Sequence, residues 1–265
     1  MPRFADDRWY PAGARELQQR VRSLLVSEER LRSVLGVVAP HAGYVYSGQV
    51  AGALYGSIHV PERVILLGPN HHGRGAKQAI QCRGEWRIPG YKIPIDEAAA
   101  ERLCEEAPWL RDDAHAHEIE HSLELQLPFL VMRNPGVRVV PICLWQQSLE
   151  DCRRLGEALG RAIEGLPGDT LIVASSDMNH FDEASTGRRK DQLAIDEVLA
   201  LKPDGLYRTV RSERISMCGM VATVCMLVAC RGLGARQATL VKYMDSGDVS
   251  GDKSSVVGYA GIAVH

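Results

Sequence analysis

The sequence predicts an α/β protein, with one three-layer domain over residues 1–265 in which helices flank a central, mainly parallel β-sheet. Three observations support this fold class. Short apolar runs rich in β-branched residues alternate with helix-like segments along the chain. Apolar residues make up 45% of the chain and charged residues 24%, a balance that can fill a sizeable core. No Pro-, Gly- or Ser-rich linker divides the 265 residues, which favours one domain over two.

Six segments have the composition of strands, because they are short, apolar and rich in β-branched residues. They comprise residues 34–38, 64–67, 137–142, 171–174, 238–241 and 256–264. Pro141 cannot donate a hydrogen bond to a neighbouring strand, so we expect a sheet edge, a bulge or the end of the strand at that residue.

Apolar residues at helical spacing mark the segments between these strands. Helices are expected around residues 17–25, after Ser47, from Ser148 to Ile163, around 193–201 and 206–210, and from Met220. Ser47 and Ser148 are N-cap candidates, because a serine hydroxyl can accept a hydrogen bond from a backbone N–H of the first turn. The apolar stretch 220–230 is about half of the ~20 residues that a membrane-spanning helix needs, so it predicts a core helix.

Charge, the N-terminal segment and cysteine usage each limit the expected class of protein. The chain carries 31 basic and 33 acidic side chains without a basic stripe, so no nucleic-acid partner is expected. The charged N-terminus is followed by no apolar segment, which predicts a cytoplasmic protein without a signal peptide or a membrane anchor. The seven cysteines include no C-x-x-C pair and are expected to be mostly small buried hydrophobic residues rather than a disulfide framework.

Polar groups follow three of the predicted strands. They are His41, His71 with His72, and Asp177 with His180. The carboxyl ends of parallel strands meet at one edge of the sheet, so these side chains should converge there. A single histidine in such a loop more often satisfies a local hydrogen bond, but three placements of this kind together predict a metal site, because imidazole is the commonest metal ligand.

Cys218 lies two residues before Met220, where a helix is expected to start and where exposed N–H groups and the helix dipole favour a thiolate. Spacing alone leaves open whether Cys218 is a metal ligand or a core thiol.

A second polar cluster contains Glu120, His121 and Glu124. The alternation of Leu123, Leu125 and Leu127 would also suit a strand, but we favour a helix. Residues 117–121 match the H-E-x-x-H motif of zinc peptidases, but no third ligand follows at a suitable spacing, so an accidental match is expected. The G-x-S-x-G, phosphate-loop and G-x-G-x-x-G motifs are absent, which disfavours serine hydrolases, P-loop enzymes and dinucleotide-dependent dehydrogenases.

Several motifs occur in order along nearly the whole chain. They are Ala39-Pro40-His41-Ala42-Gly43-Tyr44, Gly68-Pro69-Asn70-His71-His72, Glu120-His121-Ser122, Ser175-Ser176-Asp177 with His180, Cys218-Gly219, and Ser246-Gly247-Asp248 with Val257-Gly258-Tyr259. Together they resemble the Memo family, whose prokaryotic members look like component B of the AmmeMemoRadiSam system. The segment Trp9-Tyr10-Pro11 also fits, whereas Asp6-Asp7-Arg8 departs from the family pattern.

The resemblance implies a fold similar to that of class III extradiol dioxygenases, which bind non-haem Fe(II) through two histidines and a carboxylate. It implies metal ligands at His41, His71 and Cys218, with Fe(II) as the expected ion and copper or zinc as alternatives. A thiolate at Cys218 would replace the carboxylate, so ring opening does not follow from the resemblance. His121, Asp177 and His180 would be the catalytic residues that orient ligands or take a proton.

The expected function is therefore that of a metal-binding protein, a dioxygenase or other redox enzyme acting on a phenolic or enediol-like small molecule. His121 or His180 would remove the substrate proton, and O₂ would be the co-substrate. The alternatives are a non-catalytic scaffold that binds a metal or a peptide, and a zinc-dependent hydrolase. The resemblance also implies a radical-SAM protein and other proteins of the same system as partners.

Overall fold

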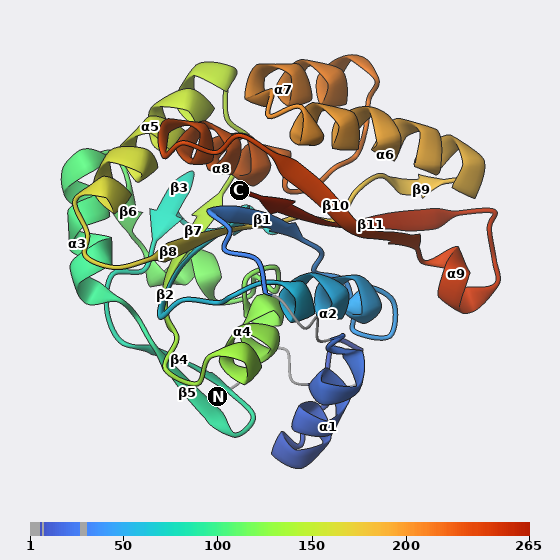
Figure 1. Ribbon diagram of the computed structural model, residues 1–265, viewed down its shortest axis with the longest axis horizontal. Helices are drawn as coiled ribbons and strands as arrows, with labels where there is room; N and C mark the ends of the chain where they lie inside the picture. The colour runs from blue at the N-terminus through green and yellow to red at the C-terminus, as the bar shows by residue number, and fades with distance from the viewer. Residues whose placement is uncertain (1–5, 7, 27–30) are drawn as a thin grey trace.

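A nine-stranded β-sheet forms the centre of the computed structural model, which describes residues 6, 8–26 and 31–265 (Figure 1). The order across the sheet is β10 (Ala238–Asp245), β11 (Val256–Val264), β1 (Gly36–Ala39), β8 (Thr170–Ser175), β2 (Arg63–Pro69), β7 (Arg138–Leu144), β3 (Gln78–Ile80) and β6 (Arg111–Asp112). The ninth strand, β9 (His180–Asp182), pairs with β11. A separate hairpin consists of β4 (Glu85–Ile88) and β5 (Tyr91–Pro94).

The four central strands, β1, β8, β2 and β7, are parallel, as predicted. Antiparallel strands extend the sheet on both sides, β11 and β10 beyond β1, and β3 beyond β7. All residues of β1, β2 and β8 are buried, because helices cover both faces of a parallel sheet.

Helices form a layer on each face of the sheet (Figure 1). One layer contains α3 (Glu97–Glu106), α5 (Leu149–Glu164), α6 (Ala184–Leu199), α7 (Pro203–Ser212) and α8 (Met220–Gly232), and the other contains α1 (Ala14–Leu24), α2 (Gly48–Ser57) and α4 (Leu127–Arg133). Successive residues of a strand point to opposite faces, so Ile65 and Leu67 pack in the first core and Val64 and Leu66 in the second. The predicted three-layer α/β fold is confirmed.

The two predicted serine caps behave differently. The hydroxyl of Ser148 accepts the N–H of Asp151 at 3.1 Å and caps α5, as predicted. Ser47 occupies the N-cap position of α2, but the prediction for its side chain was wrong, because its hydroxyl donates to the carbonyl of Ala42 at 2.7 Å.

The helix from Met220, α8, is a core helix as predicted, with 13 residues that are almost all buried. Within the ranges that the structure describes, none of the helices has both the length and the apolar character that a bilayer crossing requires.

Pro141 lies inside β7 rather than at a sheet edge, and pairs in parallel with Leu66 of β2. On its other side, the pairing of β7 with β3 covers only residues 142–144. The carbonyl of Pro141 still accepts the N–H of Gln81 at 3.2 Å. The paired residues of β7 and β3 therefore end next to Pro141, whereas β7 itself continues through the proline.

The outer strands of the sheet are irregular or short. In β10, the pairing with β11 shifts between Leu240 and Lys242, so Val241 is an extra residue in a β-bulge. At the opposite edge, β6 has only two residues. A short helix, α9 (Gly247–Ser250), lies between β10 and β11.

Candidate metal centre

Three imidazole rings meet beyond the carboxyl ends of the central strands. His41 follows β1 and His71 follows β2, while His121 comes from the loop that precedes α4. One ligand-capable atom of each histidine lies within 4.8 Å of those of the other two. The ring centroids of His71 and His121 are 4.8 Å apart, and that of His41 lies 5.3 and 5.5 Å from them. Nitrogen ligands bind a divalent ion at about 2.0–2.1 Å, so small side-chain rotations would allow all three rings to bind one ion.

A buried hydrogen-bond chain determines which nitrogen of His41 is free. The hydroxyl of Ser175 donates its one hydrogen to the carbonyl of Ser122 at 2.7 Å, and accepts the side-chain N–H of Gln126 at 2.8 Å. Nδ1 of His41 lies 2.9 Å from the same hydroxyl and must therefore be the donor. Burial lowers the pKa of His41 to about 3, so the ring is neutral and its Nε2 carries a free lone pair.

Glu120 fixes His71 in the same way. Its carboxylate accepts the backbone N–H of His71 at 2.7 Å, Nδ1 of that ring at 2.9 Å, and the N–H of Ser122 at 2.9 Å. Burial raises the pKa of Glu120, but hydrogen bonds and charge from His71 and the Ser122 N–H outweigh this and lower it to about 2. An ionised carboxylate only accepts, so Nδ1 of His71 donates and its Nε2 is available to a metal ion.

His121 was predicted to be catalytic, and the structure places it within the histidine cluster. Its Nδ1 lies 3.6 Å from the carboxylate of Glu120, and its ring packs against Trp9 at a centroid distance of 4.2 Å. Burial, together with the neighbouring charge of His41, lowers the pKa of His121 to about 3. The ring is therefore neutral near pH 7, as a metal ligand must be.

Cys218 lies beside the cluster but outside the group of three. Its Sγ is 3.2 Å from Nε2 of His41 and accepts the N–H of Asp177 at 3.3 Å. Burial and the negative charge of Asp177 raise the pKa of the Cys218 thiol well above its ordinary value. The expectation that the start of α8 alone favours a thiolate was wrong, because desolvation is the larger effect. A bound cation would be needed to hold Cys218 as a thiolate.

Asp177 and His180 lie next to this cluster. The buried carboxylate of Asp177 accepts the backbone N–H of His41 at 2.8 Å, and burial raises its pKa to about 6. It therefore holds the loop that carries His41 rather than the imidazole ring. Nδ1 of His180 lies 3.0 Å from the carbonyl of Ser216, an acceptor, so this nitrogen donates and, in the neutral ring, Nε2 is the acceptor.

The helix predicted around Glu120 and His121 was wrong. Residues 118–123 are neither helix nor strand, and regular structure resumes with a 3-10 helix, Glu124–Gln126. Glu120 accepts the N–H of Ser122, a local hydrogen bond that competes with helix formation. The H-E-x-x-H match was accidental, as expected: His117 ends a separate 3-10 helix, Ala114–His117, and is not in the histidine group.

Sequence reasoning missed the residues that orient the ligands. Glu120 was noted only as part of a polar cluster, and Ser175 and Gln126 were given no role. Gln126 is a fully buried amide between two leucines, and its side chain bonds the hydroxyl of Tyr55, the carbonyl of Pro40 and Ser175. A polar residue in an apolar run was the one available signal, because buried polar groups need partners.

Ser175→Ala is expected to weaken metal binding by about 10- to 100-fold, the usual cost of removing a group that orients a ligand. The substitution leaves Nδ1 of His41 and the amide of Gln126 without their shared acceptor. Competition titration against a chromophoric chelator measures the affinity. Ser57→Ala is the matched control, because Ser57 is also fully buried but bonds only a carbonyl in α2. Equal affinities of both variants and the wild type would contradict this role of Ser175.

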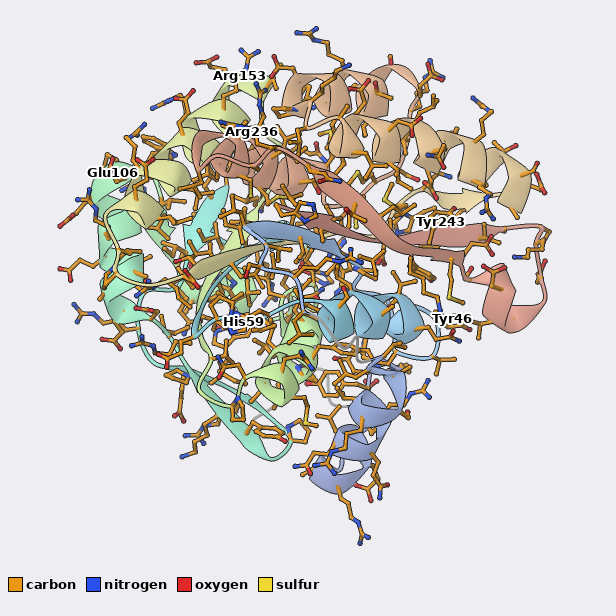
Figure 2. All side chains as sticks on the ribbon, in the orientation of Figure 1. Tyr46, His59, Glu106, Arg153, Arg236 and Tyr243 are labelled. Atoms are coloured by element: carbon orange, nitrogen blue, oxygen red, sulfur yellow. The ribbon has the colours of Figure 1, made fainter. Side chains whose placement is uncertain are left out.

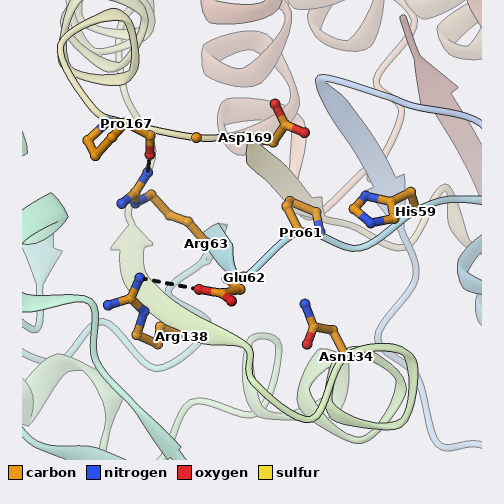
Figure 3. A pocket seen from close by; sticks show the side chains of 9 residues that line it. His59, Pro61, Glu62, Arg63, Asn134, Arg138, Pro167 and Asp169 are labelled. Carbon is orange, nitrogen blue, oxygen red and sulfur yellow. Dashed lines mark hydrogen bonds and ion pairs between the residues drawn. The ribbon is translucent and has the colours of Figure 1, made fainter.

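A cavity of about 380 Å³ lies at the opposite, amino-terminal ends of the strands (Figure 3). Arg63 and Arg138 line it, but both are paired: Arg63 with Asp96 at 2.9 Å, and Arg138 with Glu62 at 3.7 Å and with Asp96 at 3.8 Å. Figure 2 shows His59, which also lines the cavity, far from Tyr46, whose loop begins at His41. This cavity is therefore distinct from the metal centre, and its charges are internally balanced.

A sequence profile described as Memo-like protein matches residues 2–263. A MEMO1 family protein from Caldivirga maquilingensis is 38% identical over 247 residues, 92% of this chain and 88% of that protein. A MEMO1 family protein from Methanopyrus kandleri is 38% identical over 96% of this chain and 95% of its own length. The crystal structure of the uncharacterized protein JW3007 from Escherichia coli K12 has a similar fold, with a TM-score of 0.58, 13% identity, and coverage of 87% of this chain and 99% of that one.

Proposed function

Since the chain belongs to the Memo-like protein family, we propose that it is a metal-binding protein that holds non-haem Fe(II) and oxidises a phenolic or enediol-like small molecule. The observation that carries this proposal is the group formed by His41, His71 and His121, with one ligand-capable atom of each within 4.8 Å of the others. Three segments far apart in the chain would have no reason to bring imidazoles together at a strand edge for stability alone.

The donor set fits a divalent transition metal. Ser175 and Glu120 hold two of the imidazoles with Nδ1 as the donor, which leaves each Nε2 free to bind an ion. His121 and Cys218 are the candidates for the third ligand, the first because of its position in the group and the second because Sγ is 3.2 Å from His41. Imidazole and thiolate suit iron, copper and zinc, and we propose iron. A bound Fe(II) would supply a Lewis-acidic and redox-active centre.

We assign proton removal from the substrate to His180 rather than to His121. The carbonyl of Ser216 holds Nδ1 of His180 as a donor, so in the neutral ring Nε2 is the nitrogen that can take a proton. A side chain with a pKa of about 3, as His121 has, is a weak base near pH 7. Asp177 keeps the His41 loop in place by accepting its backbone N–H.

Substrate turnover by the iron-loaded protein is expected to stop when O₂ is removed. Nitric oxide, which occupies the position of O₂ on non-haem Fe(II), should give a characteristic paramagnetic resonance signal with wild-type protein. A panel of catechols and enediols, tested aerobically and anaerobically with iron and with zinc, provides the measurement. Unchanged anaerobic turnover would contradict the proposed O₂-dependent oxidation, and activity with zinc alone would favour a hydrolase. Stoichiometric metal without turnover would favour a metal-binding scaffold.

A further inference from the structure

Two thiols lie together far along the sheet from the metal centre. Cys82 follows β3 and Cys104 lies in α3, and their Sγ atoms are 3.7 Å apart. Both are partly exposed, whereas Cys143, Cys152, Cys225 and Cys230 are buried. No sequence motif predicts this pair, because 21 residues that include a hairpin separate the two cysteines.

We propose that Cys82 and Cys104 are a site of reversible oxidation, at which an intramolecular disulfide forms. The thiols are already in contact, and closing from 3.7 Å to a bond of about 2.05 Å requires a movement of about 1.7 Å. Side-chain rotation can supply part of this movement. The backbone N–H of Cys82 is held by the carboxylate of Asp112 at 3.1 Å, and Cys104 lies in the second half of α3, so both backbones have fixed positions.

The oxidant would be a low-molecular-weight disulfide such as oxidised glutathione. The Cys104 thiolate attacks one sulfur of that disulfide and releases one thiolate, which leaves Cys104 in a mixed disulfide. Cys82 then loses its proton, attacks Sγ of Cys104 and displaces the second thiolate, so the two cysteines lose two electrons and the disulfide gains them. We assign the first attack to Cys104, because a hydrogen bond from Cys82 partly offsets the effect of burial on its pKa.

The surroundings of Cys82 and Cys104 indicate that the disulfide between them would be a weak oxidant. Burial, Cys104 and the carboxylate of Asp112 raise the pKa of Cys82 to about 12, so neither ionisation nor a nearby cation stabilises the reduced pair. The bond would enclose the β4–β5 hairpin and residues 97–104 of α3 in a covalent loop. In a compartment that is normally reducing, this disulfide would form only while the compartment becomes more oxidising.

The test uses the full-length native protein in glutathione buffers of increasing oxidised fraction. After the remaining thiols are alkylated, trypsin should release residues 78–83 linked to residues 103–111, and this link should disappear after treatment with dithiothreitol. The oxidised protein should also melt at a temperature higher by roughly 5–10 °C, because the bond restricts the unfolded chain. Cys82→Ser and Cys104→Ser should each lack the link and the shift.

Cys152 and Cys225 provide an internal control, because their thiols are also in contact but both are fully buried between α5 and α8. They should remain alkylatable only after unfolding and should not be linked in the native protein. The proposal is overturned if residues 78–83 and 103–111 stay unlinked in native protein under the most oxidising buffer. It is equally overturned if the link forms only in urea.

Discussion

His41→Ala is expected to lower the metal content of the purified protein at least tenfold. His41 is 2% exposed, and its ring is held by Ser175 with Nε2 beside Sγ of Cys218, so its removal takes one imidazole from the centre of the group. Loss of a group that merely orients a ligand already costs about 10- to 100-fold in affinity, and loss of the ligand itself should cost at least as much. Elemental analysis of protein purified without chelator or metal-affinity resin measures the occupancy.

His59→Ala is the matched control, because His59 lines the cavity at the other end of the strands and should leave the metal content unchanged. Comparable occupancy in wild type and His41→Ala would remove the basis for a metal centre at this edge. The same measurement on Cys218→Ala and His121→Ala identifies the third ligand. If Cys218→Ala keeps full occupancy, His121 is the ligand and Cys218 only borders the site.

Arg63→Met is expected to reduce the free energy of unfolding by about 3 kcal/mol, because it leaves the buried carboxylate of Asp96 with only a longer contact, to Arg138 at 3.8 Å. The side chains of Arg63 and Asp96 are only 8% and 2% exposed, and they pair at 2.9 Å. Figure 3 shows the same guanidinium pointing to the carbonyl of Pro167, to which it donates at 2.8 Å. Urea denaturation, followed by circular dichroism, measures the change.

Arg138→Met, at the same cavity, is the control for this prediction. Arg138 is 44% exposed and its partner Glu62 72% exposed, and its second contact, to Asp96, is 3.8 Å long. Asp96 keeps Arg63 at 2.9 Å in this variant, so the loss should be about 1 kcal/mol or less. Equal effects of the two substitutions would mean that burial of the Arg63 pair has no energetic consequence.

The layered fold could be predicted because its signals are local. The spacing of Leu17, Val21 and Leu24 and the unbroken apolar run 64–67 each identify an element without reference to the rest of the chain. The strands β3, β4, β5 and β6 were missed for the opposite reason. They have two to four residues each, and exposed side chains alternate with buried ones in β4, so no apolar run marks them.

The site could be predicted only in part. Positions at strand ends identified His41 and His71, because strand direction decides where loops meet. The roles of Glu120 and Ser175 depend on partners 49 and 134 residues away, which no local pattern encodes. For the same reason, the irregular path of residues 118–123 was mistaken for a helix: the carboxylate of Glu120 bonds a distant backbone rather than its own turn.

The bulge in β10 has a consequence for how copies of this chain behave at high concentration. A regular edge strand offers a template on which strands of other molecules can add, and uninterrupted apolar runs such as residues 64–67 are the kind of segment that forms fibrils. The extra residue Val241 and the charge of Lys242 disturb that template on one edge, and β6 is too short to provide one on the other. We therefore expect the folded chain to resist edge-to-edge aggregation even though its central strands are almost wholly apolar.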